Sequence, residues 1–447
     1  MDRWHSRAGA ALFGTLAFAS FASVASAHGV RTVSTPIPGD LLLAGAAVTV
    51  GGTAAALARL DASPSRSVRE VAVVPMARGR ALLWLLRLLL LAAVVAAVVE
   101  GLTGRQARVS PATTFVWPVW VKGSLLLAAL VGNHWTALAP WMTGYELLSR
   151  LEGEDVALFE YPARLGRWPA AVGFVVLVGV VENLTVVPTR PRLTAVLVAG
   201  YALAMLLGAV GFGRAWLRNA DPLGVLYELV GRVAPLSVDR DPDTRMVVLT
   251  RRPVWHEVAT PLPGGASAAL AVAAVYTVSF DGIVETGSYQ RLLFRLADTA
   301  LGPVAGLATY LGGLVLFLAA FAAVSVLAAR LGGADAVRVT RWFGATLLPI
   351  AVAYDVAHNW PYVLVNVTAL GQLAVPGLPS VAPSPVVYWG SAVGLVVVGH
   401  LVAVVAAHLA SRELFGVDAA RGHAPLVALM VGYTVLSLWI LSRPVGG

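Results

Sequence analysis

The sequence predicts an all-α membrane protein, a polytopic bundle of about ten transmembrane helices that follow an N-terminal signal peptide. Two observations support this prediction. Of the 447 residues, 58% are hydrophobic and only 13% are charged, whereas a soluble protein has roughly 25% charged residues. Apolar runs of about 20 residues, the length that crosses a bilayer as a helix, recur along the chain. Residues 28–447 are therefore expected to form one polytopic domain in the lipid of the plasma membrane.

The first 27 residues have the pattern of a secretory signal. Arg3 and Arg7 precede an apolar run, and Ala25-Ser26-Ala27 fits the small-x-small rule for cleavage. Cleavage would leave His28 as the first residue of the mature chain, outside the membrane. An uncleaved signal anchor is the alternative interpretation.

The remaining apolar runs give the expected spans and their orientation. The spans are 39–58, 80–101, 113–132, 166–187, 192–216, 266–283, 303–331, 340–370, 387–411 and 425–442. Loops 59–79 and 217–265 are rich in arginine, so the positive-inside rule places both in the cytoplasm. Loop 217–265 contains one plausible strand, Met246–Thr250. Segments 134–155 and 287–302 are amphipathic, and we expect them to lie in the headgroup layer.

One predicted span has a polar stripe. The stretch "AVAYDVAHNWPYVLVN" (351–366) contains Asp355, His358, Asn359, Tyr362 and Asn366. At 100° per residue, these five side chains fall within a sector of about 100°. Lipid cannot satisfy them, so the stripe must face protein or water. A proline at position 361 predicts a kink beside the histidine. The alternative is a hydrogen-bond network between helices that binds no ligand.

Further acids lie on the same predicted side of the membrane. Glu182 falls in the outer half of its span, and Asp281 and Glu100 fall near the outer ends of theirs. Together with the stripe they predict an outward-facing polar vestibule. A mature N-terminal His28 offers an amine and an imidazole, a chelating pair for Cu, Zn or Ni. We therefore expect His28, Asp281 and His358 to bind a divalent metal.

Several kinds of site are absent from the sequence. There is no cysteine, which excludes disulfides and thiolate metal sites. Lys122 is the only lysine and lies in no Walker A motif, and no G-x-S-x-G or H-E-x-x-H motif occurs. The net charge of +8 is explained by the arginine-rich loops, so neither a nucleic-acid partner nor a soluble nucleotide site is expected. His400 and His408 could extend a proton path inward, or be buried and hydrogen-bonded.

Several phrases occur together in one known family. These are "AHGV", "PIPGDLL", "LAPWMTGYELL", "YPARLGRWPAA", "RVAPLS", "SFDGIVET" and "AYDVAHNWPYVLVNVTALGQL". The chain resembles, from Ala27 to about Gln372, a prokaryotic family of polytopic membrane proteins catalogued as fenitrothion hydrolases. The resemblance implies hydrolysis of an organophosphorus ester and places His28, Asp281 and His358 at positions of the family pattern. Asp355 and Asn359 are less typical of that pattern.

Three functions are compatible with these observations. The first, which we favour because no motif for a nucleophile appears, is transport or metal-ion handling, with a small solute or metal ion bound in the outer vestibule. The second is a membrane-embedded, metal-dependent hydrolase, in which the metal would activate water. The third is a structural or assembly partner whose polar stripe only packs helices. Whether the protein is an enzyme stays open at this point.

Overall fold

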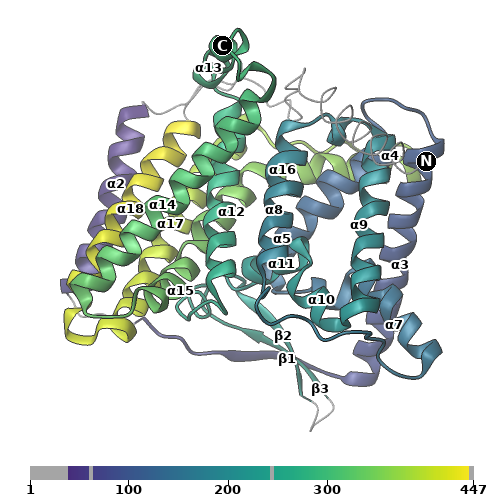
Figure 1. The fold of residues 1–447 in the computed structure, drawn as a ribbon, viewed down its shortest axis with the longest axis horizontal. Helices are drawn as coiled ribbons and strands as arrows, with labels where there is room; N and C mark the ends of the chain where they lie inside the picture. The colour runs from purple at the N-terminus through teal and green to yellow at the C-terminus, as the bar shows by residue number, and fades with distance from the viewer. Residues whose placement is uncertain (1–38, 60–63, 242–245, 442–447) are drawn as a thin grey trace, which may run out of the picture.

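The protein is built almost entirely of helices, as the computed structural model shows (Figure 1). The structure describes residues 39–59, 64–241 and 246–441. The predicted all-α class is confirmed for these residues. The predicted signal peptide and His28 lie outside them.

The described helices vary from one turn to eight or nine turns. They are α2 (Gly39–Arg59), α3 (Met76–Thr103), α4 (Pro111–Thr114), α5 (Gly123–Val131), α6 (Trp135–Leu138), α7 (Pro140–Glu152), α8 (Trp168–Phe174), α9 (Pro191–Phe212), α10 (Arg214–Asn219), α11 (Pro222–Gly231), α12 (Gly265–Val284), α13 (Gly287–Ala297), α14 (Ala305–Gly332), α15 (Ala336–Thr346), α16 (Leu348–Ala374), α17 (Pro385–Phe415) and α18 (Ala419–Leu441). Two π-helical segments, η1 (Phe115–Lys122) and η2 (Val175–Glu182), continue α4 and α8, and short 3-10 turns are η3 (Val187–Thr189), η4 (Gly302–Val304) and η5 (Gly416–Asp418).

Six helical stretches in the described part of the chain are long and apolar enough to cross a membrane. They are Met76–Thr103, Pro111–Val131, Pro191–Phe212, Gly265–Val284, Gly302–Gly332 and Pro385–Ile440. Leu43–Arg59, Trp168–Glu182 and Pro222–Gly231 are shorter apolar helices. These stretches fit a multi-pass membrane protein, but they do not confirm all ten predicted spans.

The predicted span 340–370 is wrong in its bounds, because the chain forms two helices there. Helix α15 ends at Thr346 and α16 begins at Leu348. Pro349 has no N–H group and fits only the first turn of a helix, so a new helix starts at this point. Helix α16 then continues through Pro361 to Ala374.

The two ends of the bundle differ (Figure 1). Helices α13 and α4 lie at one end, here called the α13 end. The opposite end, here called the sheet end, carries α7, α10, α15 and a three-stranded antiparallel sheet of order β1-β3-β2. The strands are β1 (Arg69–Pro75), β2 (Leu236–Asp241) and β3 (Met246–Arg251), and β3 confirms the predicted strand.

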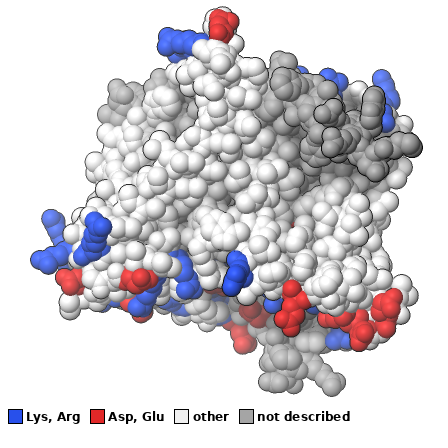
Figure 2. Space-filling model, in the orientation of Figure 1, with Lys and Arg blue, Asp and Glu red and all other residues white. Residues whose placement is uncertain are grey.

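The sheet joins the two loops that are predicted to be cytoplasmic. Val73 of β1 pairs with Val248 of β3. Beside the sheet, the Arg66 guanidinium donates to the His256 carbonyl over 2.7 Å. Loops 59–79 and 217–265 therefore lie at the same end of the molecule. Charged side chains gather at this end, and the middle of the visible face is uncharged (Figure 2).

The two predicted interfacial segments have different structures. Segment 287–302 contains α13, whose Leu292 and Phe294 are exposed, as an interfacial helix requires. Segment 134–155 differs from the prediction, because Trp135 and Trp141 are each only 1% exposed. Their indole N–H groups both donate to the buried carboxylate of Asp221, which draws them into the core.

Candidate functional site

A buried ion pair connects the polar stripe of α16 to two other helices. Lys122 Nζ lies 2.9 Å from Glu182 Oε1 and 3.6 Å from Asp355 Oδ1. All three side chains are at most 10% exposed. Lys122 therefore places a single ammonium group between carboxylates of η2 and α16.

The two residues of the Lys122–Glu182 ion pair occupy equivalent positions in two π-helical segments. Lys122 is the last residue of η1, and Glu182 is the last residue of η2. At the end of η1, the Gly123 N–H reaches the Pro118 carbonyl, five residues back. A π-helical turn holds about one residue more than an α-helical turn, which rotates the following side chains by about 100°. The π-helical segments thus set the direction in which Lys122 and Glu182 point.

A second contact connects α16 to α12. His358 Nε2 lies 3.4 Å from Asp281 Oδ2, and the Tyr354 ring stacks on the His358 ring with 6.4 Å between centroids. Two of the three predicted metal ligands are therefore neighbours, whereas His28 lies outside the described residues. Among the described residues, no group of three or more histidines and acids could hold a metal ion. The metal site stays a prediction.

The two amides of the stripe bond along their own helix. Asn359 is 1% exposed, and its Nδ2 donates to the Asp355 carbonyl over 3.1 Å. Asn366 Nδ2 donates in the same way to the Tyr362 carbonyl over 2.8 Å. Because these amide bonds lie within one helix, they do not form the network between helices that was the alternative. Ion pairs between helices join five groups, Lys122, Glu182, Asp281, Asp355 and His358, which we call the acid–lysine cluster.

The cluster borders a narrow cavity. Lys122, Glu182, Asp281 and Asp355 line its polar part. Its volume is about 40 Å³, enough for about three water molecules. Asn183, Tyr227 and Thr277 also line it, and most of the other lining side chains are apolar. Among these are Phe174 of α8, Leu226 and Leu229 of α11, Leu270 of α12, and Leu348 and Val352 of α16.

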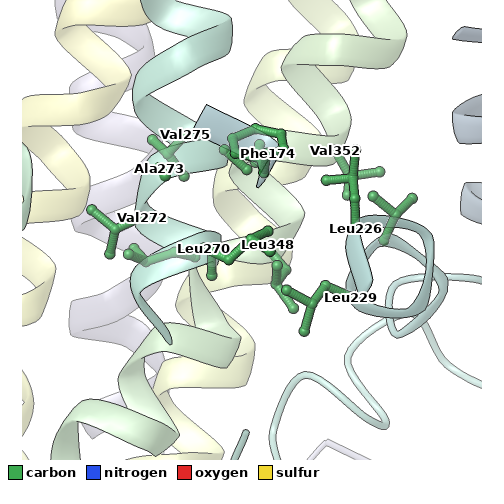
Figure 3. Close-up of a cluster of buried hydrophobic side chains, with 14 of the residues drawn as sticks. Phe174, Leu226, Leu229, Leu270, Val272, Ala273, Val275, Leu348 and Val352 are labelled. Carbon is green, nitrogen blue, oxygen red and sulfur yellow. The ribbon is translucent and has the colours of Figure 1, made fainter. Parts of the chain in front are cut away.

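Part of the apolar lining lies nearer to the sheet end than the charged residues of the same helices. Leu270 and Leu348 lie side by side in Figure 3, and the α11 leucines face them. Helix α12 starts near the sheet end, and Leu270 precedes Asp281 by about 16 Å along it. We call this set (Phe174, Leu226, Leu229, Leu270, Leu348 and Val352) the apolar layer. Its members on α12 and α16 precede Asp281 and Asp355 along those helices.

The cluster holds more negative than positive charge. Three carboxylates share it with one lysine and one histidine. Glu182 Oε2 and Asp355 Oδ2 are buried and have no hydrogen-bond partner among the described residues. A buried carboxylate oxygen without a partner is costly, so these atoms favour binding of a proton, a cation or water.

Sequence reasoning missed Lys122 as a member of the site. Its signal was present: it is the only lysine, and it lies inside the apolar run "VWPVWVKGSLLLAALV". A charged residue at that depth requires a partner of opposite charge. The rule that identified Glu182 and Asp355 would have identified Lys122 as well.

Other candidates from the sequence lie elsewhere. Glu100 Oε2 accepts the backbone N–H of Ala112 over 2.9 Å and so caps α4. His400 is 1% exposed, and its Nδ1 bonds the Val396 carbonyl of its own helix. The His408 ring lies 6.2 Å from the ring of His423. Neither His400 nor His408 lines the cavity.

No family model, no curated protein and no solved structure matches the chain. The assignment of a function therefore depends on the geometry of the site.

Proposed function

We propose that the protein is a membrane transporter that exchanges a small cation for protons at the acid–lysine cluster. The observation that carries this proposal is the pair of buried carboxylate oxygens, on Glu182 and Asp355, that have no partner beside a single ammonium group. A small cation or a proton can occupy these oxygens. The cation or the proton would compete with Lys122 for the same carboxylates. Because both ions need the same oxygens, binding of one displaces the other, and this competition couples their movements.

The size of the cavity favours ions over larger substrates. A volume of about 40 Å³ holds about three water molecules, far less than the roughly 300–1,000 Å³ of pockets for small organic ligands. An organophosphorus ester would need a much larger space beside the cluster. Transport is therefore better supported than hydrolysis, although the Asp281–His358 contact would suit either chemistry.

The direction of access follows from exposure and charge. Asp281 is 22% exposed, whereas Asp355 is 5% exposed and lies nearer the apolar layer. The cluster thus opens toward the α13 end. The arginine-rich loops lie at the sheet end, which the positive-inside rule assigns to the cytoplasm. Cations would reach the cluster from outside the cell.

Exchange can be measured with the purified protein in liposomes that enclose a pH-sensitive dye. External NaCl, KCl or ZnCl₂ is added, and the internal pH is followed. We expect one of these cations to drive proton exchange in the wild type. Exchange should fall about tenfold or more in Glu182→Gln and Asp355→Asn, because each loses a charged partner worth at least ~1.4 kcal/mol.

The matched control is Glu413→Gln, which removes an exposed acid near the end of α17 and should leave exchange unchanged. The proposal fails if no cation produces a pH change above that of empty liposomes. It also fails if both cluster variants exchange at the wild-type rate.

A further inference from the structure

Glu285 extends the row of acids on α12 beyond the cluster. It follows the last residue of α12, its backbone keeps helical angles, and it lies one turn beyond Asp281. Side chains four residues apart on a helix lie on the same face, about 5–6 Å apart. Glu285 is half-buried, whereas Asp298, also at the α13 end, is exposed. This difference distinguishes Glu285 from an ordinary surface acid.

The groups around Glu285 belong mainly to the cluster and its aromatic neighbours. Asp281 and His358 are the charged partners that act on Glu285. Tyr354 of α16 and Tyr388 of α17 are close enough to be influenced by its charge. On the adjoining α13, the Arg291 guanidinium donates to Ser288 Oγ over 3.1 Å. Groups of α12, α16 and α17 therefore lie within electrostatic range of this carboxylate.

Apolar side chains line the cavity on the other side of the cluster, among them Leu270 of α12 and Leu348 of α16. Bare ions do not cross an apolar region without water. Glu285 is half-buried directly after the last residue of α12, one turn beyond Asp281 in the direction of the α13 end.

We propose that Glu285 is the mouth carboxylate of the acid–lysine cluster, which takes up the proton or cation from the α13 end and shares it with the Asp281–His358 pair. This inference rests on the proposed transport function, and it adds a residue that the sequence analysis did not select. Burial raises the pKa of Glu285 to about 6; His358 acts against this rise, and Asp281 adds to it. Glu285 can therefore bind and release a proton near neutral pH.

The first test reads protonation directly and needs no transported substrate. Dicyclohexylcarbodiimide modifies protonated carboxyl groups in apolar surroundings, and peptide mass spectrometry locates the modified residue. In the wild-type protein, modification of Glu285 should be half-maximal near pH 6 and decline above it. The midpoint should move to lower pH in Asp281→Asn and to higher pH in His358→Asn, because these variants remove influences of opposite sign.

The second test uses the exchange assay with Glu285→Gln, Glu285→Asp and the control Asp298→Asn. Glu285→Gln should lower exchange about tenfold or more, because loss of one charged interaction of ~1.4 kcal/mol corresponds to a factor of ten, and it should abolish the change in rate near pH 6. Glu285→Asp should restore most of the rate. The inference is overturned if Glu285→Gln resembles Asp298→Asn, or if the modification midpoint is the same in the wild type, Asp281→Asn and His358→Asn. Absence of exchange in the wild type refutes the proposed function, and the modification midpoints then decide by themselves whether Glu285 shares protons with the pair.

Discussion

At the scale of single residues, the central feature is an ammonium group buried inside an apolar bundle. Removing Lys122 from water is costly, and two carboxylates within 4 Å offset that cost. Such a pair is a weak source of net stability, because burial of both charges opposes their attraction. Its presence inside the bundle is therefore the observation on which the proposed ion binding rests.

Replacement of the ammonium group gives a prediction at this scale. Lys122→Met leaves Glu182 and Asp355 side by side without a cation, so we expect a loss of about 3–5 kcal/mol in the free energy of unfolding. Exchange should also disappear. The double variant Lys122→Met with Glu182→Gln should regain part of the stability but none of the exchange, as thermal unfolding in detergent and the liposome assay will report.

The control for this variant is Arg421→Met, which breaks an exposed pair with Asp418 and should cost less than about 1 kcal/mol. If Lys122→Met unfolds at the wild-type temperature and still exchanges ions, the ion pair has neither of the roles proposed for it.

At the scale of elements, the two π-helical segments determine where the charged side chains point. Both η1 and η2 end on a member of the ion pair. A regular α-helix through either segment would direct its last residue to another face of the bundle. The apolar sequence of these segments predicts that they are helical. It does not predict the extra residue in the π-helical turns, which changes the direction of the side chains that follow.

Removal of the extra residue from η2 tests its role. Deletion of Val176, which is 48% exposed on the bundle surface, should turn Glu182 by about 100° away from Lys122. Exchange should then fall as far as in Glu182→Gln. Val176→Ala, which keeps the register, is the matched control and should behave as the wild type. Exchange at the wild-type rate in a folded deletion variant would show that the register of η2 does not matter.

At the scale of the whole molecule, the proposed function requires the cluster to open at the α13 end and the apolar layer to close the other. The chain contains no cysteine, so single cysteines can be introduced without removing any native thiol. Val278 and Leu270 both line the cavity on α12, about 12 Å apart along the helix axis. They lie on opposite sides of the boundary between the polar part and the apolar layer.

Accessibility of these two positions tests the closed end. A charged methanethiosulfonate reagent added from the α13 end should modify Val278→Cys in liposomes, because the polar part of the cavity admits water. Leu270→Cys should stay unmodified from either side, as measured by the mass of the intact protein. Equal rates at the two positions would show that the apolar layer does not seal the cluster.

Much of the candidate site could be predicted from single residues. Asp355, His358, Glu182 and Asp281 were identified because charge inside lipid is costly and must face protein or water. Their distribution over two separate contacts, one with Lys122 and one between Asp281 and His358, could not be predicted. Pairing between helices depends on packing, and no short-range pattern in the chain encodes it.

The sequence by itself determined the all-α fold and the apolar runs that fit a multi-pass membrane protein, because these depend on composition and on the lengths of apolar runs. The tertiary structure alone decided that Lys122 stands between two carboxylates, that Trp135 and Trp141 are buried on Asp221, and that apolar side chains of α8, α11, α12 and α16 line the cavity beside the cluster. The physical reason is that a buried charge must find a partner somewhere, whereas the choice of partner depends on which helix faces meet.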